Sequence, residues 1–586
     1  MRCIRPCLLA TLIVASTLHA QSPVNYVPPV SAISVATPSE LADLVNRYSD
    51  DWQLLNRRFA LAGSSDRPVA RTFLTTWRST LDSLPYSNLG VEGRIDWHLL
   101  QNEIAHEQAL LDREAQRGQQ LASLLPFVAA INGLESARRE FRFTPGDSAA
   151  AILSHIASVA DSLRKAVDSG SVKPSRIEAY RAADMTASAG RTMARWFRFS
   201  DGYDPAFSWW TRAPYAEADS ALKAYAKVLR EKVVGMKKGE GDPIVGQPIG
   251  REGLMADLQA EMIPYTPEEL IAEAQRQMDW MTVEMKTASH EMGFGDDWKA
   301  ALEAVKQDHV APGEQPELVR DLAREAVDYV ESHDLVTVPP LARDAWRMTM
   351  LSAEAQKTAP FFLGGEVVQI AYPTDSMTEP DKLMSMRGNN RHFARATVFH
   401  ELIPGHELQQ FMGERYNAQR GLFGTPFFWE GNSFYWETLF WDMGFPRSPA
   451  DRIGMLFWRM HRSARVIFSL NFHLGKWTPE QCIQFLVDRV GHERANAEAE
   501  VRRSFNGDYS PLYQVAYMMG GMQFRALHHE LVDSHRMTDR AFHDAILQSG
   551  PIPVELVRAR LEGIKLAKDW KPSWKFLGEL PAGRSY

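Results

Sequence analysis

Helical periodicity extends through most of this 586-residue sequence and limits the fold classes open to it. Trp97, Leu100 and Ile104 recur at spacings that place them on one face of a helix, as expected where a helix packs against a core. Two helix starts, at Thr266 and Thr478, show a threonine, then a proline, then an acid or amide three residues after the threonine. Because 45% of the residues are hydrophobic, the chain can bury a large core. The sequence therefore predicts a mainly α-helical protein.

Strand-like patterning is scarce and is clearest at residues 366–373, where β-branched residues roughly alternate with others. This segment fits either an edge strand or a short structural hairpin. Clusters of Gly and Pro at 239–250, 311–316 and 335–341 predict loops, and the second cluster is rich enough to separate two lobes. We expect a large two-lobed helical fold with a small β-sheet and a cleft between the lobes.

The first 20 residues match the pattern of a secretory signal peptide. Arg2 and Arg5 precede an apolar run, and Ala20 is a suitable cleavage position. Leu18 is larger than the residue usually found three positions before the cut, so an uncleaved anchor stays open as an alternative. No later apolar run approaches the ~20 residues of a membrane span. We expect export to the periplasm of a Gram-negative bacterium, without stable membrane insertion once the signal is removed.

Charge and cysteine content exclude some functions. Loss of the signal takes the formal net charge from −8 to −10, and no basic stripe is visible, so nucleic acid is not expected as a partner. Cys3 and Cys7 leave with the signal, and Cys482 alone cannot form an intramolecular disulfide. Cys482 sits in a helical pattern and is predicted to be a buried hydrophobic residue. The sequence does not indicate the oligomeric state.

Residues 400–406, with the sequence HELIPGH, pair two imidazoles with a carboxylate in the order used by zinc peptidases. His400 and His406 are six positions apart, whereas the familiar helical zinc motif separates its histidines by about four. On a regular helix, the observed spacing turns the second imidazole about 120° away and about 9 Å along the axis. An undistorted helix therefore cannot bring both imidazoles to one ion.

Pro404 and Gly405 offer a way to distort the helix. Proline lacks an N–H and its ring collides with the carbonyl four residues back, while glycine tolerates unusual dihedrals. We interpret residues 402–405 as a locally widened helical turn that carries two extra residues. The alternative is a helix that ends at Ile403, with His406 starting another helix and neither histidine binding metal.

A catalytic zinc usually has three protein ligands, and Glu430 is the best candidate for the third. It opens a predicted helix 24 positions after His406, which gives the chain room to turn and bring a second helix antiparallel to the first. Glu437 follows seven residues later on nearly the same helical face. It is either a partner that orients a ligand or a rival ligand.

These motifs resemble those of the bacterial domain-of-unknown-function 885 family, which is grouped with the gluzincin metallopeptidases. Apart from HELIPGH, the matching features are Glu430-Gly431 with Tyr435 and Glu437, the segment 465–473, Tyr513-Gln514-x-x-Tyr517-x-x-Gly520, and Phe542-His543 leading to Gly550-Pro551-Ile552-Pro553. The pattern covers the chain from about residue 35 onward and is weaker before residue 340. Asn432 and Ser433 stand where the family commonly has Trp and Ala, which bears on pocket shape and substrate preference more than on the metal.

The resemblance implies one Zn²⁺ per chain, and it favours Glu430 over Glu437 as the ligand beside His400 and His406. Zinc held there would activate a water molecule, and Glu401 would act as the general base. The resemblance further implies Tyr517 as a donor to the oxyanion, with Tyr513 and His473 as other donors, and an extended strand beside the active-site helix.

Arg387, Arg391 and Arg502 could clamp a substrate carboxylate, or could form surface salt bridges instead. We expect an N-terminal helical region at 21–340 and a catalytic region at 341–586. The predicted function is an exported zinc-dependent peptidase that acts on short or unfolded peptides. Two alternatives stay open: a non-catalytic protein that binds metal or peptide on a peptidase-like scaffold, and a hydrolase of a non-peptide amide or ester.

Overall fold

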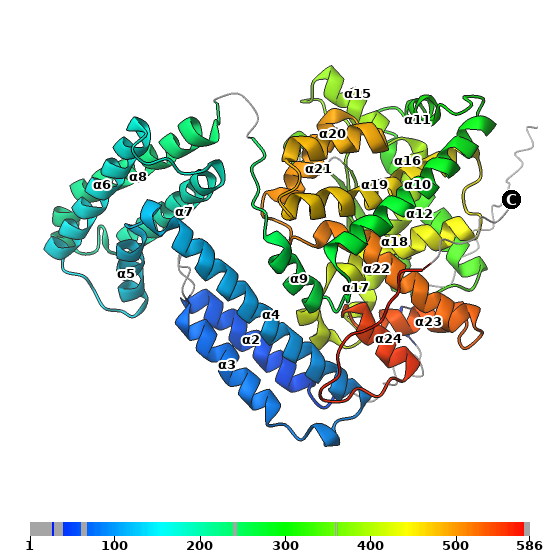
Figure 1. Cartoon of the computed structure of the whole chain (residues 1–586), viewed down its shortest axis with the longest axis horizontal. Helices are drawn as coiled ribbons and strands as arrows, with labels where there is room; N and C mark the ends of the chain where they lie inside the picture. The colour runs from blue at the N-terminus through cyan, green and yellow to red at the C-terminus, as the bar shows by residue number, and fades with distance from the viewer. Residues whose placement is uncertain are drawn as a thin grey trace, which may run out of the picture.

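The computed structural model describes residues 26–28, 39–59, 67–237, 243–357, 359 and 361–578. The predicted signal peptide lies outside the described residues. Within them, the chain is mainly helical and has one small sheet of two strands (Figure 1). This confirms the prediction of a mainly α-helical protein with a small sheet.

The N-terminal part forms an arm of three long helices that leads to a separate bundle (Figure 1). The arm consists of α2 (Ala42–Phe59), α3 (Pro68–Asp82) and α4 (Val91–Leu121), with the short turns η1 (Tyr86–Asn88) and η2 (Ala122–Leu124). The bundle consists of α5 (Val128–Arg139), α6 (Gly146–Ser169), α7 (Arg176–Ser200), α8 (Pro205–Val228) and the π-helical turn η3 (Leu229–Val234).

The rest of the chain forms the main body. Its helices are α9 (Gly250–Ala260), α10 (Pro267–Glu291), α11 (Trp298–Gln307), α12 (Gln315–Ser332), α13 (Pro340–Ala345), α14 (Ala353–Gln356), α15 (Glu379–Gly388), α16 (Arg391–Glu401), α17 (His406–Gly413), α18 (Pro426–Asp442), α19 (Pro449–His473), α20 (Pro479–Val490), α21 (Arg494–Phe505), α22 (Tyr513–His528), α23 (Asp539–Leu547) and α24 (Val554–Glu562). Two further turns are η4 (Ala418–Phe423) and η5 (His529–Asp533), and the strands are β1 (Arg347–Met350) and β2 (Val367–Ile370).

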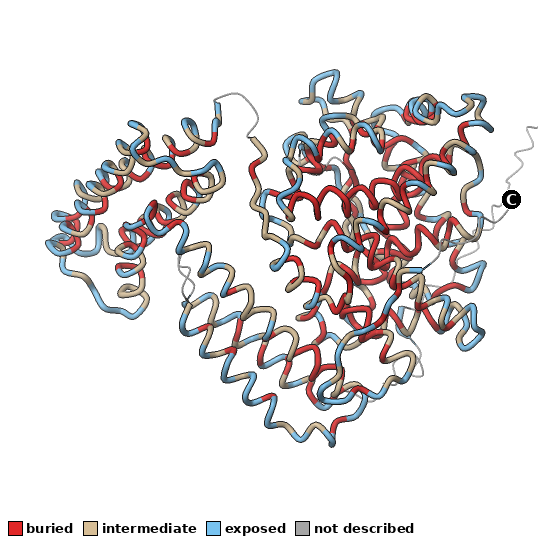
Figure 2. Tube along the Cα trace, in the orientation of Figure 1, coloured by how far each residue is buried: buried red, intermediate tan, exposed pale blue. Residues whose placement is uncertain are grey.

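Buried apolar residues form two large clusters. One belongs to residues 121–245 and fills the bundle of α5 to α8, while the other joins the arm to the main body (Figure 2). In the main body, α19 is buried along its whole length from Ile453 to His473, as expected for a helix surrounded by others. The division expected between residues 340 and 341 stays a prediction.

The sheet lies beside α16, the helix that carries the first histidine of the motif. Val368 and Ile370 of β2 share a small apolar cluster with Val398 and Leu402. β1 and β2 are parallel. The other edge of β2 is engaged by an isolated antiparallel bridge, in which Leu363 and Gln369 exchange backbone hydrogen bonds at 3.0 and 2.8 Å. The chain doubles back between these two residues, as in the hairpin alternative, and the segment 361–365 lies outermost on this side of β2.

Several local predictions are confirmed. Thr266 and Thr478 each cap a helix, since the threonine hydroxyl accepts from the backbone N–H three residues on and that residue's side chain accepts from the threonine N–H. Trp97 and Ile104 are buried on one face of α4. Cys482 is buried, which raises the pKa of its thiol to about 12. Among the described helices, none has the length and apolarity to cross a membrane.

Candidate functional site

The HELIPGH segment joins two separate helices. Helix α16 ends at Glu401, and α17 begins at His406. The regular helix is interrupted between them, because Leu402 leaves the helical region with φ −113° and ψ −114°. Gly405 donates its N–H to the carbonyl of Phe399 at 3.0 Å, six residues back, whereas a regular α-helix bonds four residues back. The turn therefore carries the two extra residues that were predicted, but it separates two helices. A Cβ at Gly405 would lie 1.9 Å from the backbone oxygen of His400, so no larger residue fits this turn.

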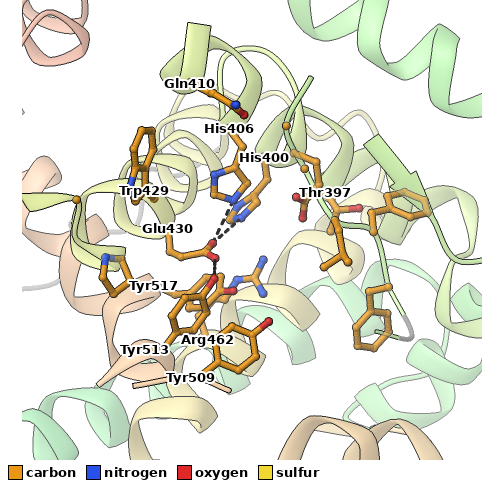
Figure 3. Close-up of a pocket in the computed structure, with 18 of the residues that line it drawn as sticks. Thr397, His400, His406, Gln410, Trp429, Glu430, Arg462, Tyr509, Tyr513 and Tyr517 are labelled. Atoms are coloured by element: carbon orange, nitrogen blue, oxygen red, sulfur yellow. Dashed lines mark hydrogen bonds and ion pairs between the residues drawn. The ribbon is translucent and has the colours of Figure 1, made fainter. Parts of the chain in front are cut away.

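This turn brings the two imidazoles together. The alternative with two helices had assumed that the histidines would not share a site. Their ring centroids are 4.9 Å apart and their planes are nearly perpendicular. Nε2 of His400 lies 3.4 Å from Oε2 of Glu430, and Nε2 of His406 lies 3.2 Å from the same oxygen (Figure 3). Three ligand-type atoms on three helices therefore converge.

Their spacing fits a divalent metal ion. Metal–ligand bonds of about 2.0–2.2 Å in a tetrahedral arrangement put neighbouring ligand atoms about 3.3–3.6 Å apart. Oε2 of Glu430 is buried and accepts no well-formed hydrogen bond from any described residue, so it is available to a cation. His400, His406 and Glu430 can hold such an ion. Glu401 also offers a carboxylate oxygen within 4.8 Å of ligand atoms of both histidines.

The close crossing of α18 and α22 places Glu430. A Cβ on Gly431 would lie 2.5 Å from Cα of Gly520, so these glycines let the two backbones touch. The crossing also brings Tyr513 to Glu430, where the tyrosine hydroxyl donates to Oε1 at 2.5 Å. Burial and the neighbouring carboxylate raise the pKa of Tyr513, which keeps it a donor. Tyr513 lines the cavity, and its hydroxyl is directed to Glu430. Its predicted role as an oxyanion donor stays a prediction.

Glu437 stands on the other side of His400. Its Oε1 lies 2.7 Å from Nδ1 of His400 and accepts a hydrogen bond from Arg462 at 3.2 Å. A carboxylate on the ring nitrogen that faces away from the metal orients an imidazole ligand. The geometry therefore favours Glu437 as a partner that orients His400 over Glu437 as a ligand.

His406 has a weaker partner on its outer nitrogen. Oγ of Ser433 lies 3.3 Å from Nδ1 of His406 and accepts a hydrogen bond from Gln409 at 2.8 Å. The family pattern commonly has Ala here, so this contact distinguishes the chain from that pattern.

The charges of the cluster favour a cation. Burial raises the pKa of Glu430, but the imidazoles of His406 and His400 outweigh it and hold that pKa well below its usual range. Burial lowers the pKa of His400, but contacts with Glu430 and Glu437 outweigh it and raise that pKa to about 9. Burial raises the pKa of Glu401. Carboxylates thus gather around two imidazoles in a buried place, which attracts positive charge.

The cluster opens into a cavity of about 810 Å³. Glu401 lines it, and its backbone oxygen accepts a hydrogen bond from the N–H of Gly365 at 3.2 Å, which ties the segment 361–365 to the motif.

Tyr517 faces the same cavity, and its ring is nearly parallel to that of His400, with the ring centroids 6.2 Å apart (Figure 3). No described residue forms a hydrogen bond with the Tyr517 hydroxyl. Burial raises the pKa of Tyr517, so this hydroxyl keeps its proton and can donate a hydrogen bond.

His473 was predicted as an oxyanion donor, and the structure does not bring it to this site. It lies eight residues beyond Arg465 on α19, about 12 Å further along the axis. Its ring packs against Phe472 and Phe505 and lines a different cavity of about 650 Å³. Burial lowers the pKa of His473 to about 4.

The arginines proposed as a carboxylate clamp also lie elsewhere. Arg387 pairs with Glu303 and Glu493, and Arg391 pairs with Asp308. Arg502 does not line the cavity, because successive residues of a helix point about 100° apart and the next residue faces inward instead.

Sequence reasoning missed the arginines that do line the cavity. They are Arg462 and Arg465 of α19 and Arg503 of α21, joined by Tyr509. One signal was present: the first two are three positions apart, so they share a helix face, and the second begins a segment that matches the family pattern.

Comparisons with known proteins agree with this fold. The model of a family described as bacterial protein of unknown function (DUF885) matches residues 62–561. A solved structure from Shewanella oneidensis has 18% identity and a TM-score of 0.64, and the match covers 90% of this chain and 100% of that one. A crystal structure from Colwellia psychrerythraea has 14% identity and a TM-score of 0.56, with 89% and 98% covered. Both are described as a "putative lipoprotein", the first of unknown function.

No curated protein matches the chain. The two solved structures are too distant in sequence to show more than a shared fold, which extends over nearly the whole length of each. The family match spans most of the sequence and includes every residue of the cluster. This chain therefore belongs to the bacterial DUF885 family.

Proposed function

We propose that this protein is a zinc-dependent peptidase with a gluzincin-like centre, in which His400, His406 and Glu430 hold one Zn²⁺ and Glu401 is the general base. The observation that carries the proposal is the meeting of two imidazole nitrogens with one carboxylate oxygen at 3.2 and 3.4 Å, beside a further buried carboxylate. Metal analysis of the purified protein tests the ligand set directly.

Bound zinc would lower the pKa of a water molecule towards ~7 and polarise the scissile carbonyl. Glu401 accepts a proton as the water oxygen adds to the carbonyl carbon, and then delivers that proton to the leaving amine nitrogen. The peptide bond breaks to give one carboxylic acid and one amine. Tyr517 donates its O–H to the carbonyl oxygen while that oxygen carries negative charge.

The size and walls of the cavity support a peptide substrate. A volume of about 810 Å³ suits a short or unfolded segment, whereas a folded protein would not enter. The segment 361–365 forms one wall beside Glu401, where an extended peptide can lie along the backbone. The separate core of residues 121–245 supports a two-lobed molecule.

Export belongs to the same proposal. The first 20 residues have the signal pattern, and the descriptions of the two solved structures as lipoproteins support a location outside the cytoplasm. A peptidase in the periplasm would meet short peptides there. N-terminal sequencing of the exported protein tests whether the chain begins at Gln21.

The catalytic proposal is tested with Glu401→Gln and the exposed control Glu354→Gln. We expect about one zinc per chain in both, with peptide cleavage lowered at least about 100-fold in Glu401→Gln and unchanged in the control. A metal-loaded protein that cleaves no member of a peptide library would be a binding protein. Cleavage of esters without cleavage of peptides would make it a hydrolase of another class.

A further inference from the structure

Three buried arginines form one wall of the cavity that holds the candidate metal ligands. Arg462, Arg465 and Arg503 are 4%, 2% and 8% exposed, and all three line the cavity. Each has one buried guanidinium nitrogen to which no described residue offers an acceptor: Nε, Nη1 and Nε respectively. Buried donors normally have partners, and an unmet donor costs about 1–3 kcal/mol. This wall is therefore prepared for an acceptor that the described residues do not provide.

The charges of the wall do not balance. Arg465 forms two hydrogen bonds with Glu500 at 2.7 and 3.0 Å, and Arg503 reaches the same carboxylate at 4.0 Å. Arg462 pairs with Glu437. Three guanidinium groups thus share two carboxylates among the described residues, which leaves one positive charge without a partner.

Two further carboxylates act on the wall from a distance, since Glu401 interacts electrostatically with Arg462 and Glu430 with Arg465. Neither forms an ion pair with an arginine of the wall, and under the proposed function both serve the metal site.

The remaining neighbouring titratable groups add no negative charge. Burial lowers the pKa of His461 and His492, so both are neutral and neither adds charge of either sign. Burial raises the pKa of Tyr517, which is therefore also neutral. Tyr509 accepts a hydrogen bond from Arg503 at 2.9 Å, and a hydroxyl oxygen leaves the charge of the guanidinium in place.

The wall lies close to the candidate metal. The ring centroid of Tyr517 is 4.3 Å from Cζ of Arg465, 4.8 Å from Cζ of Arg462 and 6.2 Å from the ring centroid of His400. In Figure 3, Arg462 and the three cavity tyrosines lie below Glu430, and the two histidines lie above it. The ring of His400 is thus at most 10.5 Å from Cζ of Arg465. One or two residues of an extended peptide, at about 3.3–3.6 Å each, together with a guanidinium–carboxylate contact of about 4 Å, cover such a span.

We propose that the arginine wall binds a carboxylate of the substrate one or two residues beyond the scissile bond, and that this carboxylate is the free C-terminus of a short peptide. This proposal rests on the proposed peptidase function. It makes the protein an enzyme that removes one or two residues from a C-terminal end. Guanidinium groups bind carboxylates with charge-assisted hydrogen bonds, which gives such a site both strength and orientation.

The test uses matched N-acetylated tripeptides that end in a free acid or in an amide. Their affinities for the zinc-loaded full-length Glu401→Gln protein are measured by calorimetry, and their hydrolysis by the wild type is measured in parallel. We expect the acid to bind at least about ten-fold more tightly than the amide and to be cleaved with a correspondingly higher kcat/KM. Equal affinity for the acid and the amide overturns the proposal.

Two variants at Arg503 and one control variant test whether the arginine wall causes the preference for the free acid. Arg503→Met removes one guanidinium while Arg465 still pairs with Glu500, and we expect the preference for the acid to fall below about three-fold. Arg503→Lys keeps the charge and recovers part of the preference. Arg391→Met, at an arginine outside the cavity, retains it in full. An undiminished preference in Arg503→Met, with the fold confirmed by circular dichroism, also counts against the proposal.

Two further outcomes are informative. One distinguishes a C-terminal carboxylate from a side-chain carboxylate, and the other distinguishes failure of the carboxylate site from failure of the peptidase function. An amidated peptide that ends in glutamate but binds like the free acid shows that the wall takes a side-chain carboxylate, which overturns the C-terminal assignment. If the wild type cleaves neither peptide yet binds the acid preferentially, the peptidase function fails while the carboxylate site stands.

Discussion

Glu437 lies 2.7 Å from Nδ1 of His400, while the carboxylate of Glu430 lies 3.4 Å from Nε2 on the other side of the same ring. The imidazole is therefore held between two glutamates that come from one helix, α18, seven residues apart. Two turns of that helix therefore supply both Glu430, a candidate ligand, and Glu437, the group that orients His400. Arg462 completes the arrangement by donating to Glu437.

Glu437→Gln tests this relationship. The substitution keeps the size of the side chain but removes the charge that holds the Nδ1 proton of His400, so the imidazole becomes a weaker and less well oriented ligand. We expect zinc affinity to fall about 10–100-fold, measured by competition with a chromophoric chelator. The exposed control Glu354→Gln should match the wild type. Unchanged affinity in Glu437→Gln would show that His400 needs no such partner.

Gly405→Ala should abolish the site. The new Cβ would meet the carbonyl oxygen of His400 at 1.9 Å, so the turn that joins α16 to α17 cannot keep its conformation. We expect loss of bound zinc and a fall of more than about 2 kcal/mol in the free energy of unfolding. Gly190→Ala is the matched control, because nothing lies within 4 Å of its Cβ and alanine favours the helix by up to about 1 kcal/mol. Denaturant titration and metal content of both variants check the pair, and a metal-loaded Gly405→Ala protein contradicts the expectation.

The sequence allowed the residues of the cluster to be predicted, but not the path of the chain between them. The order of His400, Glu401 and His406 and the position of Glu430 named the groups that meet in the structure. Proline and glycine in the motif showed that a regular helix must fail there. They did not show that the widened turn would divide the segment into two helices, because that depends on what packs around the turn.

The arginine wall could not be predicted from the sequence in the same way. Whether an arginine faces a cavity or a salt bridge depends on the phase of its helix against neighbours that are distant in sequence. Arg502 and Arg503 illustrate this, since one position decides which of them lines the cavity. His473 failed for a related reason: it lies on the right helix, but more than two turns too far along it.

Tyr513→Phe tests whether the tyrosine hydroxyl holds Glu430, the third candidate ligand, in position. The hydroxyl of Tyr513 donates to Oε1 of Glu430 in a buried place, so its loss leaves one carboxylate oxygen without that donor. The carboxylate can then rotate, and we expect zinc to bind about ten-fold more weakly. Tyr416→Phe, at a tyrosine outside the cavity, is the control. Equal zinc affinity in both variants would mean that α18 alone fixes Glu430.

Glu261 should make the protein less stable as the pH rises, and it lies away from the metal ligands. Burial raises the pKa of its carboxyl to about 7, although Thr425 donates a hydrogen bond to it. The unfolded chain releases this proton near pH 4.5, whereas the folded chain keeps it until about pH 7. The free energy of unfolding therefore falls by up to about 3 kcal/mol between those pH values because of this group, and it falls no further above them.

Glu261→Gln stays neutral and can still accept a hydrogen bond from Thr425. We expect the free energy of unfolding of this variant to equal that of the wild type near pH 4.5 and to exceed it at pH 8. Urea titrations of both proteins at the two pH values measure this difference, and a constant offset between the proteins would show that Glu261 ionises normally in the folded state.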